Sequence, residues 1–243
     1  MRLTVFGFAG SYPRADSPCS SYLLEANGFR LLVDLGNGAL SVLQRHIGIH
    51  DVDAVLVSHL HSDHWADLAP YAVAWRYAPE PPDRTLPVYG PAATAERLAA
   101  VQDGEPEEFD IRPLRPGKLE IGPFALRTAV VDHPVETYAC RFENAGRALT
   151  YSADTGPCGE LVDLARGADA FLCEASFVDD PANTPHLHMS GRDAGEHAAR
   201  AEVGRLLLTH LVAWNDDVRV HQEAAAAFAG RVDRVASGAT YEI

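Results

Sequence analysis

The sequence contains His59-Leu60-His61-Ser62-Asp63-His64, six residues of which four carry side chains that can bind a metal ion. This segment follows directly on the apolar run of residues 54–57, which has the composition of a buried strand. Clusters of this kind are rare by chance. The segment therefore predicts a metal site rather than a group of solvated loop histidines.

The spacing of these side chains indicates how they would be used. In a helix His59 and His61 would point to nearly opposite sides, so a pair that shares one ion requires extended or looped backbone. Asp63 and His64 lie further on and can bind a second ion. A carboxylate beside imidazoles suits zinc, manganese or iron, and the segment has no cysteine for a closed structural zinc site.

Two ions need more than four ligands, and three further candidates stand where an apolar run ends. His133 follows the run of residues 129–131, Asp154 follows 149–153, and His210 follows 206–209. The ends of buried strands are where site residues of mixed sheets usually lie. Taken singly, each could be an ordinary loop residue, but together with the six-residue segment they complete a ligand set for two ions.

Apolar runs and turn signals predict the order of strands and helices. Strands are expected at residues 2–8, 21–25, 29–33, 51–57, 86–89, 124–131, 138–143, 148–152, 170–173 and 205–208. Helices are expected at residues 39–46, 65–77, 92–101, 190–200 and 216–228, with an acidic loop at 103–108. Ser190 and Asp193 have the spacing of a capping box. A meander is followed by alternating strands and helices, and this order occurs twice. It predicts one α/β (α+β) domain over residues 1–243, in which two mixed sheets pack face to face with helices outside. The boundary between the two halves is expected near 113–117.

Composition limits the classes of protein that the chain can belong to. Of its 243 residues 47% are hydrophobic, enough for a large core. The net charge of −14 argues against a general nucleic-acid binder. Apolar runs are shorter than the ~20 residues needed to span a membrane. The four cysteines form no C-x-x-C pair and no signal segment opens the chain, so we expect a cytoplasmic protein with no membrane partner.

The order of the candidate ligands resembles that of the metallo-β-lactamase superfamily. The resemblance rests on H-x-H-x-D-H, His133, the segment Tyr-Ser-Ala-Asp-Thr-Gly around Asp154, and Leu-Leu-Thr-His around His210, and it covers nearly the whole chain. It implies a four-layer αβ/βα sandwich with two divalent ions, zinc first and manganese or iron as alternatives, at one edge between the sheets. It also implies the ligands: His59, His61 and His133 for one ion, Asp63, His64 and His210 for the other, and Asp154 between both. Ala153 departs from the usual glycine, which affects only the local backbone.

Two further residues are placed by a narrower resemblance. His188, in His-Leu-His-Met-Ser-Gly, is similar to the extra histidine of the ribonuclease Z-like phosphodiesterase branch, where it faces the scissile phosphate. Without the resemblance, His186 and His188 would be interpreted as solvated loop histidines. Glu174 is either a partner that orients a histidine or the polar end of a strand. The remaining histidines are interpreted as surface or structural: His46, His50, His197 and His221.

Within this branch the chain looks most like the mycobacterial-type atypical class II cyclic-AMP phosphodiesterases, for example in Trp75-Arg76-Tyr77 and in residues 187–191. This likeness implies a hydrolase of a small phosphodiester, with conversion of cyclic AMP to 5′-AMP as the first candidate reaction. The ions would activate a water for in-line attack. Asp63, His188 and Glu174 are the catalytic candidates, with His188 stabilising or protonating the leaving oxygen. The likeness also implies a homodimer, although no apolar stripe in the sequence supports one.

Three other functions remain open. A ribonuclease Z-type endonuclease for transfer-RNA 3′ ends shares these motifs, but it grips RNA with an arm between the third histidine and the bridging aspartate, and only 21 positions separate His133 from Asp154. The acidic charge also argues against RNA. A lactone or thioester hydrolase would use the same dinuclear site, and only the His188 motif favours phosphodiesters. A non-catalytic metal-dependent binding protein would have been free to lose ligands, and here all are present.

Overall fold

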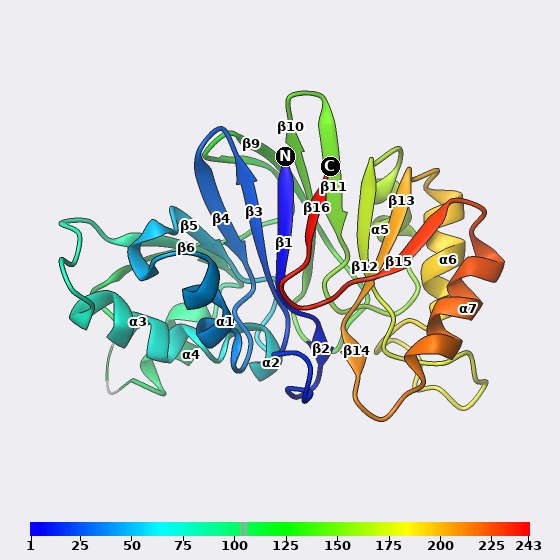
Figure 1. Cartoon of the computed structure of the whole chain (residues 1–243), viewed down its shortest axis with the longest axis horizontal. Coiled ribbons are helices and arrows are strands. Elements are labelled where there is room, and N and C mark those ends of the chain that lie inside the picture. Colours follow the sequence, from blue (N-terminus) through cyan, green and yellow to red (C-terminus); the bar gives the residue numbers. More distant parts are fainter. Residues whose placement is uncertain (103, 105) are drawn as a thin grey trace.

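Two seven-stranded sheets pack face to face, with helices on their outer sides (Figure 1). The computed structural model describes residues 1–243 except 103 and 105. A short third sheet pairs β2 (Ala9–Gly10) with β14 (Leu211–Val212) and lies between the two large sheets at the lower edge of the view. This arrangement confirms the predicted four-layer sandwich.

The first sheet has the strand order β16-β1-β3-β4-β5-β6-β7. In that order its strands are Thr240–Glu242, Arg2–Gly7, Ser21–Ala26, Phe29–Val33, Ala54–Leu56, Leu86–Gly90 and Phe109–Pro113. Neighbours are antiparallel from β16 to β4 and parallel from β4 to β7. The β3–β4 hairpin turns at Asn27 and Gly28, whose φ angles of 52° and 81° are those of the tight turn that this residue pair favours.

The second sheet has the order β15-β13-β12-β11-β10-β9-β8 and repeats the same scheme. Its strands are Arg231–Arg234, Arg205–Thr209, Ala170–Glu174, Arg147–Tyr151, Tyr138–Asn144, Phe124–Val130 and Gly117–Ile121. Pairing is antiparallel from β8 to β11 and parallel from β11 to β15. Residues 113–117 lead from the first sheet to the second. The last strand, β16, returns to the first sheet beside β1, so the parts of the chain before and after residues 113–117 do not correspond fully to the two sheets.

Seven helices and one 3₁₀ helix are present in the described part of the chain. The first sheet carries α1 (Ala39–His46), η1 (Ile49–Asp51), α2 (Ser62–Trp65), α3 (Leu68–Tyr77) and α4 (Thr94–Ala99); the second carries α5 (Gly159–Ala165), α6 (Gly191–Arg200) and α7 (Asp217–Ala227). The predicted capping box opens α6: the Ser190 Oγ accepts from the Asp193 N–H at 3.2 Å, and an Asp193 carboxylate oxygen accepts from the Ser190 N–H at 2.9 Å.

In the first sheet, side chains of the central strands alternate between two apolar clusters. In β4, Leu31 and Val33 belong to the core between the sheets, whereas Leu32 belongs to the cluster beneath α1 and α3. The core between the sheets combines Tyr22 of the first sheet with Phe142 of the second. Because both faces of each sheet are covered, these strands are apolar along their length.

The structure corrects several predicted boundaries. The expected strand at 51–57 is shortened to β5, and residues 49–51 form a 3₁₀ helix. The expected helix at 65–77 is shortened to α3, which begins at Leu68, and the separate short helix α2 ends at Trp65. The expected helix at 92–101 is shortened to α4. The acidic loop expected at 103–108 includes two residues outside the described part of the chain. Six strands were not predicted: β2 and β14 of the short third sheet, and β7, β8, β15 and β16. The last four are edges of the two large sheets, where polar residues replace the apolar pattern of an inner strand.

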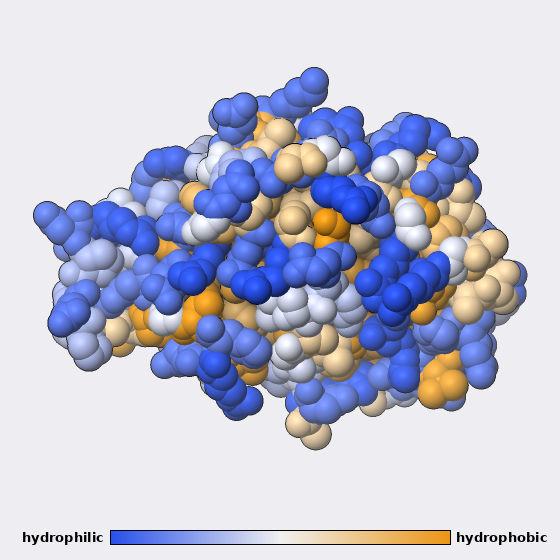
Figure 2. Space-filling view, turned by 45° about the horizontal axis from the view of Figure 1, so that its top comes forward, coloured by the Kyte–Doolittle hydropathy of each residue, from blue (hydrophilic) through white to orange (hydrophobic). Residues whose placement is uncertain are grey.

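The described helices include none that is both long and apolar enough to cross a membrane. On the face that Figure 2 shows, hydrophilic side chains predominate and apolar ones are scattered among them.

Candidate metal centre

The strands that precede the predicted ligands end at one edge of the molecule, where α2, β2 and β14 lie at the bottom of Figure 1. The first sheet contributes the segment after β5. The second sheet contributes the segments after β9, β11 and β13. Because loops from both sheets meet at this edge, side chains that are distant in sequence become neighbours.

The first cluster of candidate ligands consists of His59, His61, His133 and Asp154. One ligand atom from each lies within 4.8 Å of the others. The Nε2 of His133 lies 3.1 Å from the Nδ1 of His61, and the Nε2 of His59 lies 3.5 Å from an Asp154 carboxylate oxygen. His59 and Asp154 are buried, and the other two histidines are half-buried, so the cluster is reached from one side.

The second cluster consists of Asp63, His64, Asp154 and His210, all buried. The Nε2 of His210 lies 3.1 Å from Asp63 Oδ2 and 3.3 Å from Asp154 Oδ2. The Nε2 of His64 lies 3.2 Å from Asp154 Oδ1. Asp154 thus belongs to both clusters, and the structure brings all seven predicted ligands together in the grouping expected of a dinuclear site.

Three buried polar atoms of these clusters have no hydrogen-bond partner among the described residues: His59 Nε2, His64 Nε2 and Asp154 Oδ1. Leaving a buried polar atom unpaired is costly, and folded proteins rarely do so. Imidazole nitrogens and carboxylate oxygens are the ligands that zinc, manganese and iron take. The donor set therefore fits divalent cations, which would satisfy these unpaired atoms.

Burial and neighbouring charges shift the pKa values of the residues in these clusters in different directions. Burial lowers the pKa of His59 well below its ordinary value, and the charge of His64 lowers it further. Burial also acts against the charged form of His64, but the carboxylates of Asp154, Asp63 and Asp34 raise its pKa well above the ordinary value. Burial would raise the pKa of Asp154, yet the surrounding histidines hold it well below its usual range. These histidines therefore favour the ionised form of the Asp154 carboxylate, which is the form that binds cations.

Asp34 is a site residue that the sequence analysis missed. It is fully buried at the end of β4, and its Oδ2 accepts hydrogen bonds from His64 Nδ1 and from the Tyr151 hydroxyl, both at 2.8 Å. Its Oδ1 accepts from the Ser58 N–H at 2.7 Å. This carboxylate orients His64 so that the other ring nitrogen faces Asp154. The signal was present, because Asp34 follows an apolar strand as the other site residues do.

Two further partners hold histidine rings in place. The Nδ1 of His210 lies 2.8 Å from the Ser176 hydroxyl, which in turn donates to Glu174 Oε2 at 2.9 Å. The Nδ1 of His133 lies 2.9 Å from the carbonyl oxygen of Leu187. In both histidines the partner engages Nδ1, so Nε2 remains available to bind an ion in the cluster, as in histidines that bind metals. Ser176 and Leu187 were not singled out in the sequence, because a hydroxyl and a carbonyl carry no pattern of their own.

His188 lies between the two clusters. Its side chain is 12% exposed, and its ring centre is 5.3 Å from that of His210 and 5.6 Å from that of His133. Its Nδ1 lies 2.9 Å from Oε1 of the fully buried Glu174. Burial lowers the pKa of His188, but the charge and hydrogen bond of Glu174 outweigh this effect and raise the pKa to about 9. Of the two interpretations of Glu174, the contact supports a partner that orients a histidine.

The other histidines lie outside these clusters. His186 is 75% exposed and lies 2.6 Å from an Asp132 carboxylate oxygen. The remaining four contact structural groups: His46 the ring of Phe6, His50 the carbonyl of Trp75, His197 the backbone of Cys158, and His221 the carbonyl of Val232.

Three site residues adopt left-handed backbone conformations. Asp34, Ala153 and His210 have φ angles of 58°, 53° and 53°, which residues with a Cβ atom rarely adopt. Such strain persists where surrounding structure imposes it, often at functional sites. Ala153 is therefore accommodated in the conformation that glycine adopts readily.

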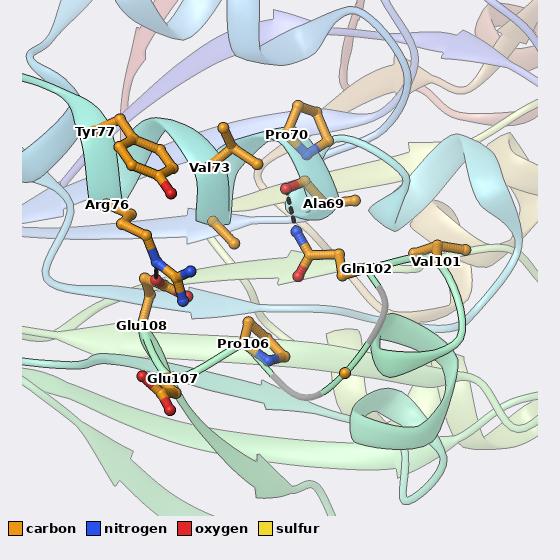
Figure 3. A pocket seen from close by; sticks show the side chains of 12 residues that line it. Ala69, Pro70, Val73, Arg76, Tyr77, Val101, Gln102, Pro106, Glu107 and Glu108 are labelled. Carbon is orange, nitrogen blue, oxygen red and sulfur yellow. Dashed lines mark hydrogen bonds and ion pairs between the residues drawn. The ribbon is translucent and has the colours of Figure 1, made fainter.

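A pocket between α3 and the segment leading to β7 lies apart from these clusters (Figure 3). Arg76 is paired there with Glu108, and the Gln102 amide donates to the carbonyl of Ala69. Among the described residues, the groups that could hold a metal ion are all at the edge beside α2.

Replacing Asp34 by asparagine is expected to weaken metal binding by roughly 10- to 100-fold, the usual effect of losing a partner that orients a ligand. The amide keeps the shape of the side chain but removes the charge beside His64. Metal affinity would be measured by competition with a chelator. Asp53→Asn is a matched control, because Asp53 also accepts a backbone hydrogen bond, from Arg30, but precedes β5 instead of following a strand at the site. Equal affinities for both variants would contradict the role of Asp34.

The chain is similar to several known proteins along most of its length. A model of the Beta-lactamase superfamily domain matches residues 29–211. The uncharacterized protein ML1173 of Mycobacterium leprae is 44% identical over 253 residues, covering 100% of this chain and 89% of its own. Ribonuclease Z of Mycolicibacterium paratuberculosis is 32% identical, covering 96% of this chain and 95% of its own.

The third similar protein is known in sequence and in structure. The probable metallo-hydrolase YhfI of Bacillus subtilis is 32% identical over 245 residues and 100% of both chains. The crystal structure of this metallo-β-lactamase fold protein matches with a TM-score of 0.91, covering 99% of this chain and 98% of that one.

Proposed function

The chain belongs to the β-lactamase superfamily as a metallo-hydrolase, and we propose that it is a phosphodiesterase. The proposed enzyme uses two divalent ions, with zinc as the first candidate metal, to cleave a small phosphodiester. A cyclic nucleotide such as cyclic AMP is the first candidate substrate. The observation that carries the proposal is the position of His188, nearly buried between the two clusters and held by Glu174.

The two clusters support a division of the ligands between two ions. His59, His61 and His133 would hold one ion, and Asp63, His64 and His210 the other, with Asp154 shared. Divalent ions bound there would polarise phosphoryl oxygens and lower the pKa of a coordinated water. Asp34 and Ser176 orient His64 and His210, and the Ser11 N–H, which donates to Asp63 at 2.7 Å, fixes that carboxylate.

His188 would act on the phosphate itself. Its Nδ1 is engaged by Glu174, and within the described residues its Nε2 has no hydrogen-bond partner. This nitrogen can therefore donate to an oxygen of the substrate. In a phosphodiester the leaving oxygen gains negative charge as its bond to phosphorus breaks, so a donor here lowers the barrier. Only the His188 motif separates this proposal from a lactone or thioester hydrolase, which is the first alternative.

The size of the substrate is inferred from what lies between His133 and Asp154. Strands β10 and β11 occupy this interval, joined by a turn at Ala145 and Gly146. They leave no room for the arm that the resemblance leads us to expect in an enzyme that grips transfer RNA. The net charge of −14 opposes a polyanion as well. Ribonuclease Z-type cleavage remains the second alternative, because one relative carries that name.

Metal analysis combined with a substrate screen tests the proposal. We expect the purified protein to hydrolyse cyclic AMP or bis(p-nitrophenyl) phosphate, to lose this activity when a chelator removes the metal, and to regain it with zinc or manganese. A lactone, an acyl thioester and a precursor transfer RNA would be assayed in parallel. Hydrolysis of the lactone or thioester alone, or of the precursor RNA alone, would refute the proposal.

A further inference from the structure

Two large aromatic side chains are exposed beside the second cluster. Tyr12 is 49% exposed and Trp214 58% exposed, and their ring centres lie 5.5 Å apart. The other two tryptophans of the chain, Trp65 and Trp75, are buried. Aromatic rings bury much apolar area when they pack inside, and neighbouring exposed rings therefore indicate a surface that binds something.

The two rings stand on segments that contain a candidate ligand or contact one. Tyr12 follows Ser11, whose N–H donates to Asp63 Oδ2 at 2.7 Å. Trp214 lies four residues after His210. It stands in a turn that is closed by a hydrogen bond from the Asn215 N–H to the Val212 carbonyl.

The pairing of β2 with β14 fixes how the two segments run. Ala9 is opposite Leu211 and Gly10 is opposite Val212, in parallel, so both segments leave the second cluster in the same direction, at the lower edge in Figure 1. The packing is close, because a Cβ atom on Gly10 would come within 2.8 Å of the His210 ring. The two aromatic rings therefore have a defined position relative to the cluster.

We propose that Tyr12 and Trp214 form a stacking surface for the base of a nucleotide whose phosphate lies at the metal clusters; this inference rests on the proposed function. A nucleotide carries an aromatic base one ribose away from its phosphate, and the site places exposed aromatic rings beside groups that can hold cations. Stacking needs only the face of a base, so the surface would accept purines and pyrimidines alike. It would restrict the small phosphodiesters of the proposed function to those that carry a base.

Kinetics with two diesters that share a leaving group would test the inference. Thymidine 5′-(p-nitrophenyl phosphate) carries a base, and methyl p-nitrophenyl phosphate does not. Trp214→Ala is expected to raise KM for the thymidine diester by roughly 5- to 100-fold, the range for loss of one stacked base, and to leave the methyl diester unchanged. Trp214→Phe should retain most of the binding. Tyr77→Ala is the control, because Tyr77 is 74% exposed at the far end of α3.

Binding to the metal-loaded protein gives a second readout that does not depend on turnover. We expect 5′-AMP to quench the fluorescence of Trp214 and ribose 5-phosphate to leave it unchanged, with the response lost in Trp214→Phe. Equal kinetic effects on both diesters, or no effect on either, would overturn the stacking surface while leaving the phosphodiesterase intact. If no diester is turned over, the proposed function fails, and the fluorescence response still decides whether a base is bound.

Discussion

Replacing Asp154 by alanine is expected to remove bound metal from both clusters and to lower turnover by more than about 10³-fold, the upper range for losing one electrostatic contact, because both ions are affected. Its carboxylate oxygens lie 3.2 Å from His64, 3.3 Å from His210 and 3.5 Å from His59. One side chain would therefore serve both proposed ions, and without it the charges of two cations would face each other unshielded.

The comparison variant for this prediction is His133→Ala. His133 belongs to the first cluster only, so its removal leaves the second cluster complete. We expect a smaller loss of metal and of turnover than for Asp154→Ala. Metal content would be measured on the purified variants together with thermal unfolding, which separates loss of metal from loss of folding. Nearly two ions per chain in Asp154→Ala would contradict the shared role.

Replacing His188 by alanine is expected to leave the metal content unchanged and to lower kcat by roughly 10²- to 10⁴-fold, the usual contribution of a general acid or of a charge-stabilising group. The ring lies between the clusters, but its Nδ1 is engaged by Glu174 and not by a ligand. His186→Ala is a matched control, because that histidine stands two positions earlier and is 75% exposed. It should have little effect.

The leaving group distinguishes the two roles that His188 can have. With p-nitrophenol, whose low pKa removes most of the need for protonation, a general acid predicts a smaller defect in His188→Ala than with a ribose hydroxyl. Electrostatic stabilisation predicts similar defects with both. Unchanged turnover of both substrates would mean that the ring does not act in catalysis, and the preference for phosphodiesters over lactones would then lose its main support.

The comparisons and the geometry contribute different parts of this interpretation. The family match covers residues 29–211, and relatives at 32% identity include a probable metallo-hydrolase and a ribonuclease Z. These relatives place the chain among metal-dependent hydrolases without separating their substrates. Our proposal for the substrate rests on residues around the clusters: His188 for the phosphate, the β10–β11 hairpin for the size, and the Tyr12–Trp214 pair for a base.

Much of the fold followed from the sequence because the inner strands are apolar on both faces and end at clear turn signals. The β3–β4 hairpin at Asn27-Gly28 and the capped start of α6 at Ser190 were both predicted and are both present. The edge strands were missed. In β15, for example, Arg231–Arg234 contains three charged residues and a single valine. An edge strand is exposed to solvent on one side and needs no apolar pattern there.

What the sequence determined by itself was the set of candidate ligands, because imidazoles and carboxylates at the ends of apolar strands have a recognisable pattern. Only the tertiary structure decided what surrounds them. The hydrogen bonds that Asp34 accepts from His64 and Glu174 accepts from His188, and the approach of Tyr12 to Trp214, join residues 30, 14 and 202 positions apart. Such contacts depend on which strands pair and where their loops meet, and the local pattern of side chains does not contain that information.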